Sequence, residues 1–112
     1  MKASEGSRGV SVLICNGDLT AASMLKLKIR LARLLHQKRK RLILDLARAK
    51  HADFSGLGIL IERLQKIRAM RGDIRMIHVQ PEISQTFDRM GLNQLIESFD
   101  SKTDAIRSYQ VA

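Results

Sequence analysis

The sequence predicts an α/β domain with a small, mainly parallel or mixed sheet of four to five strands and about four helices. β-rich apolar runs alternate along the chain with segments whose apolar residues recur at helical spacing. The β-rich runs are almost continuously apolar, as in strands that are covered on both faces. A length of 112 residues suits one hydrophobic core, so a single domain is expected.

The first half of the chain predicts two strand–helix units. Residues 10–15 (VSVLIC) form the first predicted strand, which ends at the turn sequence NGD, and helical spacing follows over residues 20–37. A second strand is predicted at residues 41–46 (RLILDL) and a second helix over residues 55–70, with Ser55 as its N-cap. Strands in this order need right-handed crossovers, which favour a parallel sheet.

The second half continues the same alternation. A third strand is predicted at residues 73–79 (DIRMIHV), and a third helix begins at Pro81 and ends near Gly91, a residue that tolerates positive φ. Residues 98–100 (SFD) are expected to form a brief edge strand. Residues 101–104 (SKTD) have capping-box spacing and predict the start of a last helix.

The N-terminal segment, residues 1–9, is expected to be flexible or to add an edge strand, and residues 10–112 to form the domain. A short or missing first strand would leave an open sheet edge, covered by a partner or by a second copy of the chain in a homodimer. No apolar stretch is long enough for membrane insertion or a signal peptide. The lone Cys15 follows apolar residues and predicts a buried thiol, so we expect a cytoplasmic protein.

The net charge of +9 is concentrated in one segment. Residues 19–44 carry eight lysines and arginines and no acidic residue. On a helical wheel Lys26, Arg30 and Arg33, called here the basic ridge, lie opposite the apolar side that includes Leu27 and Leu31. The ridge is either a solvated helix face or a contact surface for an anionic partner or membrane. Nucleic acid is not expected, because no aromatic residue lies among these basic ones.

No residue pattern predicts catalysis. The histidines have no metal-ligand spacing with one another or with Cys15, and the sequence GLGILI lacks both the third glycine of a dinucleotide site and a P-loop lysine. Ser55 is not set in the G-x-S-x-G pattern of hydrolases. A phosphorelay receiver around Asp45 would need an acidic cluster for magnesium, whereas Asp18 alone follows the first strand. We therefore expect no enzyme, cofactor or metal site.

Five motifs together resemble the STAS domain, the fold of the bacterial anti-sigma factor antagonists. They are NGDLT after the first strand, LILDL, DFSGLGIL at the start of the second helix, DIRMIHV and FDRMGLNQLI, and the resemblance runs from about Val10 to Tyr109. The combination is far more specific than any single motif.

The resemblance implies a regulatory switch. In these antagonists the serine before the first glycine, here Ser55, is phosphorylated by a partner kinase that is also the anti-sigma factor. The unmodified chain would bind this partner and free a sigma factor, phosphorylation would end the binding, and a serine phosphatase would restore it. The expected partner-binding residues are Asp18, Asp53, Phe54, Ser55, Gly56, Leu57 and Gly58.

The residues around Ser55 suit this role physically. A phosphate at the start of a helix adds about −1.5 to −2 charges at the positive end of the helix dipole, where they are tolerated. Gly56 and Gly58 would let a partner approach closely, and Asp53 is expected to shape the loop by accepting backbone amides. Asp18 is a turn residue or part of the recognition surface. Phe54 stands where the family often has a small hydroxylated residue, so this loop exposes or buries an aromatic ring.

An alternative function is a stand-alone STAS subunit of a membrane complex that transports a lipid or an anion. Such a subunit would dock on the ATPase of the transporter without entering the membrane. The basic ridge motivates this alternative.

Overall fold

The computed structural model describes residues 2–5 and 9–110, and within these residues five strands form one sheet in the order β1-β2-β3-β4-β5. The central strands β2 (Val10–Ile14), β3 (Arg41–Asp45) and β4 (Asp73–Ile77) are parallel. β5 (Ser98–Phe99) is parallel to β4, and β1 (Lys2–Glu5) is antiparallel to β2.

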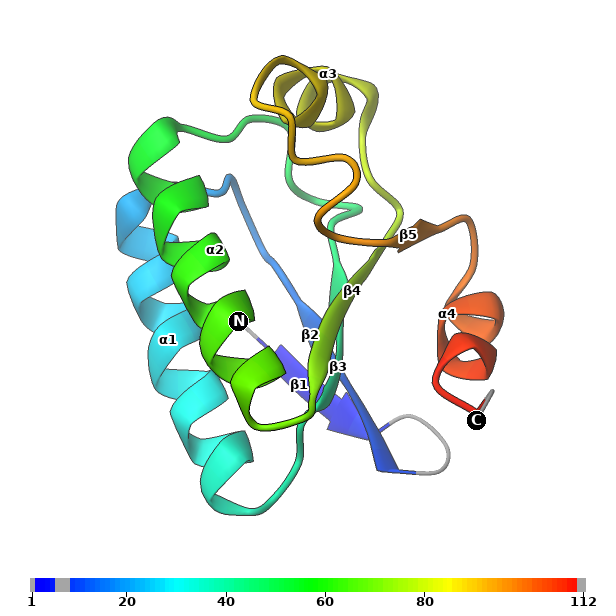
Figure 1. Ribbon diagram of the computed structural model, residues 1–112. Helices are drawn as coiled ribbons and strands as arrows, with labels where there is room; N and C mark the ends of the chain where they lie inside the picture. The colour runs from blue at the N-terminus through cyan, green and yellow to red at the C-terminus, as the bar shows by residue number, and fades with distance from the viewer. Residues whose placement is uncertain (1, 6–8, 111–112) are drawn as a thin grey trace.

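Helices cover both faces of this sheet. α1 (Ala21–His36) and α2 (Phe54–Ala69) lie side by side on one face, α4 (Lys102–Ser108) lies on the other, and α3 (Pro81–Arg89) lies beyond the end of β4 (Figure 1). The predicted α/β fold with a small mixed sheet and four helices is confirmed. None of the helices in the described part of the chain has the length and apolarity needed to cross a bilayer.

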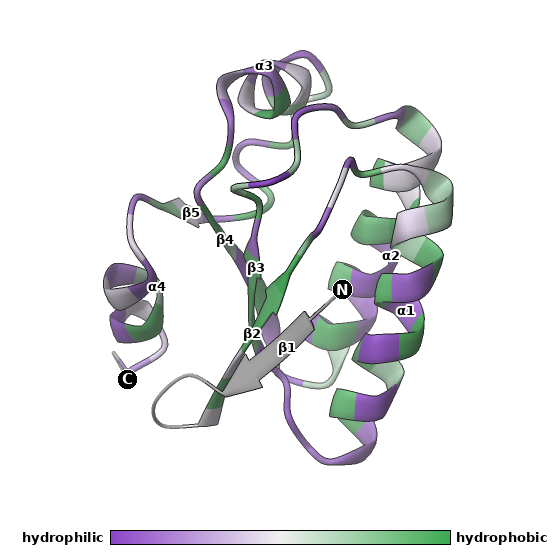
Figure 2. Ribbon diagram, turned by 180° about the vertical axis from the view of Figure 1, so that it is seen from behind, coloured by the Kyte–Doolittle hydropathy of each residue, from purple (hydrophilic) through white to green (hydrophobic). Residues whose placement is uncertain are grey.

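The core has two parts because successive strand residues point to opposite faces. Leu42 and Leu44 belong to the larger apolar cluster with α1 and α2, whereas Ile43 packs in a smaller cluster with Ile106 of α4. Hydrophobic segments run along β2 and recur along α1 (Figure 2). Cys15 is 1% exposed, as predicted, and burial together with the nearby Asp45 carboxylate raises the pKa of its thiol to about 11.

The sequence signals for the later elements also hold. α3 starts at Pro81, and Gly91 follows its end with φ of +69°. The Ser101 hydroxyl accepts a hydrogen bond from the amide of Asp104 at the start of α4. The brief strand predicted at SFD is β5, at the edge of the sheet.

The predicted N-cap of the second helix is wrong. α2 begins at Phe54, and its N-cap is Asp53, whose carboxylate accepts from the amide of Gly56 at 2.6 Å. Aspartate and serine are comparable N-caps, but the ionised carboxylate is also favoured by the positive end of the helix dipole. Ser55 is therefore the second residue of the helix.

Of the two alternatives for the N-terminal segment, an edge strand is observed at Lys2–Glu5, so the edge beside the first predicted strand is not left open. β1 pairs with β2 over four residue pairs, from Lys2 opposite Ile14 to Glu5 opposite Ser11, and so covers this edge with the chain itself. Residues 1 and 6–8 of the predicted N-terminal segment, and residues 111–112, lie outside the described residues. The edge of β2 therefore does not require a second copy of the chain.

Gly56 sets how closely α2 approaches the start of α1. A Cβ atom at this position would lie 2.2 Å from the carbonyl oxygen of Leu19 and 2.8 Å from the carbonyl carbon of Thr20. These contacts are with backbone atoms, which cannot rotate away as a side chain can. Gly58, two residues later, has no atom within 4 Å of such a Cβ.

We predict opposite effects for alanine at these two glycines. Gly56→Ala will lower the free energy of unfolding by about 1–3 kcal/mol, because overpacking outweighs the gain in helix propensity. Gly58→Ala, the matched control, will raise it by about 0.5–1 kcal/mol. Urea denaturation of the two variants measures both effects, and equal stability of Gly56→Ala and the unmodified chain would refute the close packing.

Candidate functional site

Two loops at one end of the sheet are tied to each other and fix the start of α2. The Asp18 carboxylate, in the loop after β2, accepts from the amides of Lys50 at 3.0 Å and His51 at 3.1 Å, in the loop after β3. These bonds hold the pKa of Asp18 below its ordinary value. The Leu19 amide donates to the His51 carbonyl at 2.9 Å, and the Asp53 amide donates to the Leu19 carbonyl at 3.2 Å.

Ser55 projects from this fixed frame. It is exposed, while the next residue, Gly56, is buried against the backbone of Leu19. The cap bond to the Gly56 amide is made by Asp53. The Ser55 hydroxyl is thus not needed to cap α2, and it is open to an enzyme from solvent.

The structure narrows the set of expected partner-binding residues. Gly56 is buried and Leu57 is 0% exposed in the core, so neither can meet a partner on the surface of this fold. The space above Gly56, which we expected to admit a partner, is filled by the chain's own Leu19. Asp18 is half-buried and joins the two loops, as a turn residue would, and its part in a recognition surface stays a prediction. The remaining residues of the set are exposed: Asp53, Phe54, Ser55 and Gly58.

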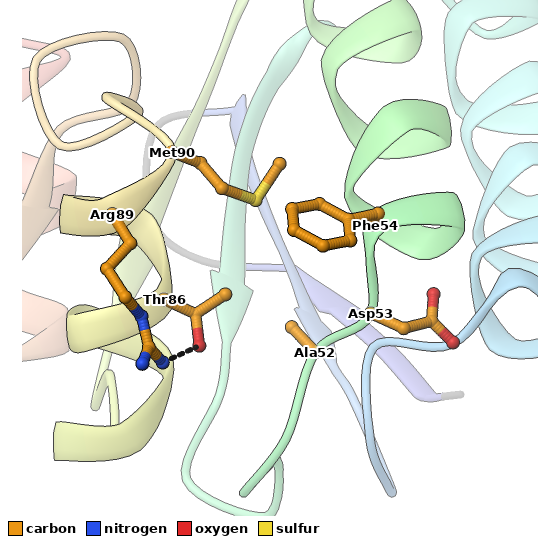
Figure 3. A pocket seen from close by; sticks show the side chains of 6 residues that line it. All are labelled: Ala52, Asp53, Phe54, Thr86, Arg89 and Met90. Carbon is orange, nitrogen blue, oxygen red and sulfur yellow. Dashed lines mark hydrogen bonds between the residues drawn. The ribbon is translucent and has the colours of Figure 1, made fainter.

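The aromatic ring of Phe54, the first residue of α2, is exposed and not buried, with 76% of the residue accessible to solvent. It borders a groove of about 560 Å³ between the start of α2 and the end of α3, lined by Ala52, Asp53, Phe54, Thr86, Arg89 and Met90. Figure 3 shows the Phe54 ring and the Met90 side chain facing each other across the groove, with the Asp53 carboxylate turned away. Arg89 donates to the Thr86 hydroxyl at 3.4 Å. An exposed aromatic edge beside a partly apolar groove is therefore adjacent in sequence to Ser55.

The α3 side of this groove was not predicted. α3 is held by its buried Ile83 and Phe87, and only the tertiary fold decides which of its other residues face Phe54. A further link joins the two sides, since Nδ1 of His51 lies 2.6 Å from the Glu82 carboxylate at the start of α3. No pattern in the sequence signals this pairing.

Two histidines near the site each lie beside a carboxylate. Among the residues that the structure describes, no three His, Cys, Asp or Glu side chains gather in a group that could hold a metal ion. His51 pairs with Glu82, and Nδ1 of His78 lies 3.0 Å from the Asp45 carboxylate. The basic ridge of Lys26, Arg30 and Arg33 is exposed along α1, as the helical wheel predicts, and does not line the groove beside Phe54.

The chain is similar to known proteins in sequence and, separately, in fold. The chain is 22% identical over 108 residues to the anti-sigma F factor antagonist of Paenibacillus polymyxa. This alignment covers 96% of this chain and 92% of that protein. The fold of the present chain is similar to that of the sulfate transporter family protein from Wolinella succinogenes, with a TM-score of 0.83 and 19% identity. The match covers 96% of this chain and 90% of that one.

The fold is also similar to that of SpoIIAA, an anti-sigma factor antagonist and cell fate determinant of Bacillus. The unphosphorylated form matches with a TM-score of 0.75 and 18% identity over 99% of this chain and 98% of that one. The phosphorylated form matches with a TM-score of 0.73 and 18% identity over 96% and 97%. The model of the STAS domain family matches residues 2–105 of the chain, so the protein belongs to the STAS domain family.

Proposed function

We propose that this protein is an anti-sigma factor antagonist. In its unmodified form it binds a kinase-type anti-sigma factor and so releases a sigma factor, and phosphorylation of Ser55 by that partner ends the binding. The observation that carries the proposal is an exposed hydroxyl on the second residue of α2, at the serine of the family motif DFSGLGIL. The likeness to a curated anti-sigma F factor antagonist over nearly the whole chain supports it.

The surroundings of Ser55 explain how a phosphate would act locally. Asp53 already caps α2, and Gly56 packs against Leu19, so neither contact depends on the serine hydroxyl. A phosphate would project into solvent at the positive end of the helix dipole, which favours its charge. The interior would stay as it is, and the surface offered to a partner would gain a bulky dianion.

The groove beside Phe54 supplies the attractive part of this surface. Large aromatic residues at the centre of an interface often contribute most of its binding energy. Phe54 directly precedes Ser55, so a partner that packs on the ring would lie within reach of the modified oxygen. A difference of about 2–3 kcal/mol between the two forms would weaken binding roughly 30- to 150-fold, which is enough to reverse a competition.

The remaining parts of the proposal follow from this mechanism. The protein acts in the cytoplasm by binding, catalyses no reaction itself and requires no cofactor. A serine phosphatase returns it to the binding form.

The second candidate is a stand-alone STAS subunit that docks on the ATPase of a transporter. The basic ridge and the similarity to a sulfate transporter family protein support it, but that similarity concerns the fold alone. Binding to an ATP-binding cassette subunit that Ser55→Asp leaves unchanged would favour this candidate over the antagonist.

The first prediction from the proposed function concerns Ser55, the residue that is modified. Incubation with its kinase-type anti-sigma factor and ATP will add one phosphate, and Ser55→Ala will abolish the addition, as intact-mass spectrometry can measure. Ser98→Ala removes an exposed serine on β5 and will leave the addition unchanged. If Ser55→Ala is phosphorylated to the same extent, the assignment of Ser55 is wrong.

The second prediction concerns the aromatic edge of the groove. Phe54→Ala will weaken the complex with the anti-sigma factor by about tenfold or more, because an exposed ring would lose its burial in the interface. The free energy of unfolding will change little, since Phe54 is 76% exposed in the free chain. Met70→Ala, at the C-terminal end of α2, is the matched control and will bind normally. Calorimetry gives both affinities, and normal binding by Phe54→Ala would exclude the groove from the interface.

A further inference from the structure

The outer face of α1 combines exposed apolar and basic side chains. Leu25 is 52% exposed and Ile29 is 57% exposed, and they lie one turn apart on the same side of the helix. The inner side of α1 already packs through the fully buried Met24, Leu27 and Leu31. The fold therefore gains little from two large aliphatic residues on the outside.

Basic residues border this apolar pair. Lys26, Ile29, Arg30 and Arg33 line a shallow hollow of about 260 Å³ on the helix surface. Residues 19–44 contain no acidic residue, so α1 itself contributes only positive charges to this hollow. A hollow lined by one aliphatic and three basic side chains fits a side chain that is apolar near its backbone and anionic at its tip.

The later part of this face extends away from the surface around Ser55. α1 begins beside Gly56, and Arg33 lies about 20 Å further along the helix axis at the helical rise per residue. A second hollow, lined by residues that include Asn16, Asp18, Thr20 and Lys26, adjoins the first part of this face. A partner that packs on Ile29 and Arg33 therefore lies away from Ser55.

The charge and shape of the outer face of α1 favour some binding partners over others. A second copy of the chain that used the same face would bring two basic ridges together, which is repulsive. Helices that lie in a membrane surface commonly insert several large apolar or aromatic residues, whereas α1 exposes only two large aliphatic ones among its described residues. A helix with glutamates beside leucines matches both the ridge and the apolar pair, and it can place a side chain in the hollow.

We propose that the outer face of α1 is a second docking surface, which binds an acidic amphipathic helix of another protein. Leu25 and Ile29 pack on the leucines of that helix, and Lys26 and Arg33 face its carboxylates. The proposal does not depend on the function assigned to Ser55.

The test uses a synthetic 18-residue helical peptide that carries leucines on one side and glutamates on both flanks, with a scrambled peptide of the same composition as control. We expect the helical peptide to bind the full chain with a dissociation constant on the order of 10 µM in calorimetry at low salt. Lys26→Glu with Arg33→Glu, and separately Leu25→Ser with Ile29→Ser, will each weaken binding by about tenfold or more. The matched charge control is Lys102→Glu with Arg107→Glu on exposed positions of α4, which will leave binding unchanged.

Several results would overturn the proposal. The helical peptide does not bind, or the scrambled peptide binds equally well. A third such result is that the α4 charge control loses as much peptide affinity as the α1 variants, which would show that net charge alone attracts the peptide. Vesicles with about 30% anionic phospholipid provide the remaining arm. If the α1 charge reversal abolishes vesicle binding and leaves peptide binding intact, the face is a membrane contact. Because Ser55→Asp does not alter α1, it will leave peptide binding unchanged, which separates this test from that of the antagonist function.

Discussion

The close approach of Gly56 to the backbone of Leu19 is the contact on which the rest of the site depends. It brings the start of α2 against the start of α1. Neighbouring hydrogen bonds can then form. The Asp53 amide donates to the Leu19 carbonyl, and the loop amides of Lys50 and His51 donate to the Asp18 carboxylate. A residue with a side chain at position 56 would push α2 outward and loosen all of these bonds together.

A local chemical change on such a frame has a local effect. Protein interiors are close-packed, so a group that lies outside the packing can change without forcing the core to rearrange. Ser55 and Phe54 lie on the outside of the frame, and Gly56 and Leu57 lie on the inside. This division within four consecutive residues lets one segment stabilise the fold and present the surface that the proposed phosphorylation would alter.

The repeating elements could be predicted because their period and end signals are local properties of the sequence. Pro81 and Gly91 bounded α3 correctly, and the wheel of α1 separated Leu27 and Leu31 from the basic ridge. The N-cap of α2 could not be chosen, since Asp53 and Ser55 are both good caps and only the packing of Gly56 sets the register. The groove between Phe54 and Met90 depends on where α3 lies in space, which no spacing within one segment records.

The central claim is that modification of Ser55 changes the surface and spares the interior. Amide hydrogen exchange, followed by NMR on the unmodified chain and on the chain carrying phosphoserine at position 55, tests it most directly. We expect the same protection of the β2, β3 and β4 amides in both forms, with changes confined to the first turn of α2 and the adjoining loops. A loss of protection across the three strands would contradict it, because the phosphate would then act by loosening the fold.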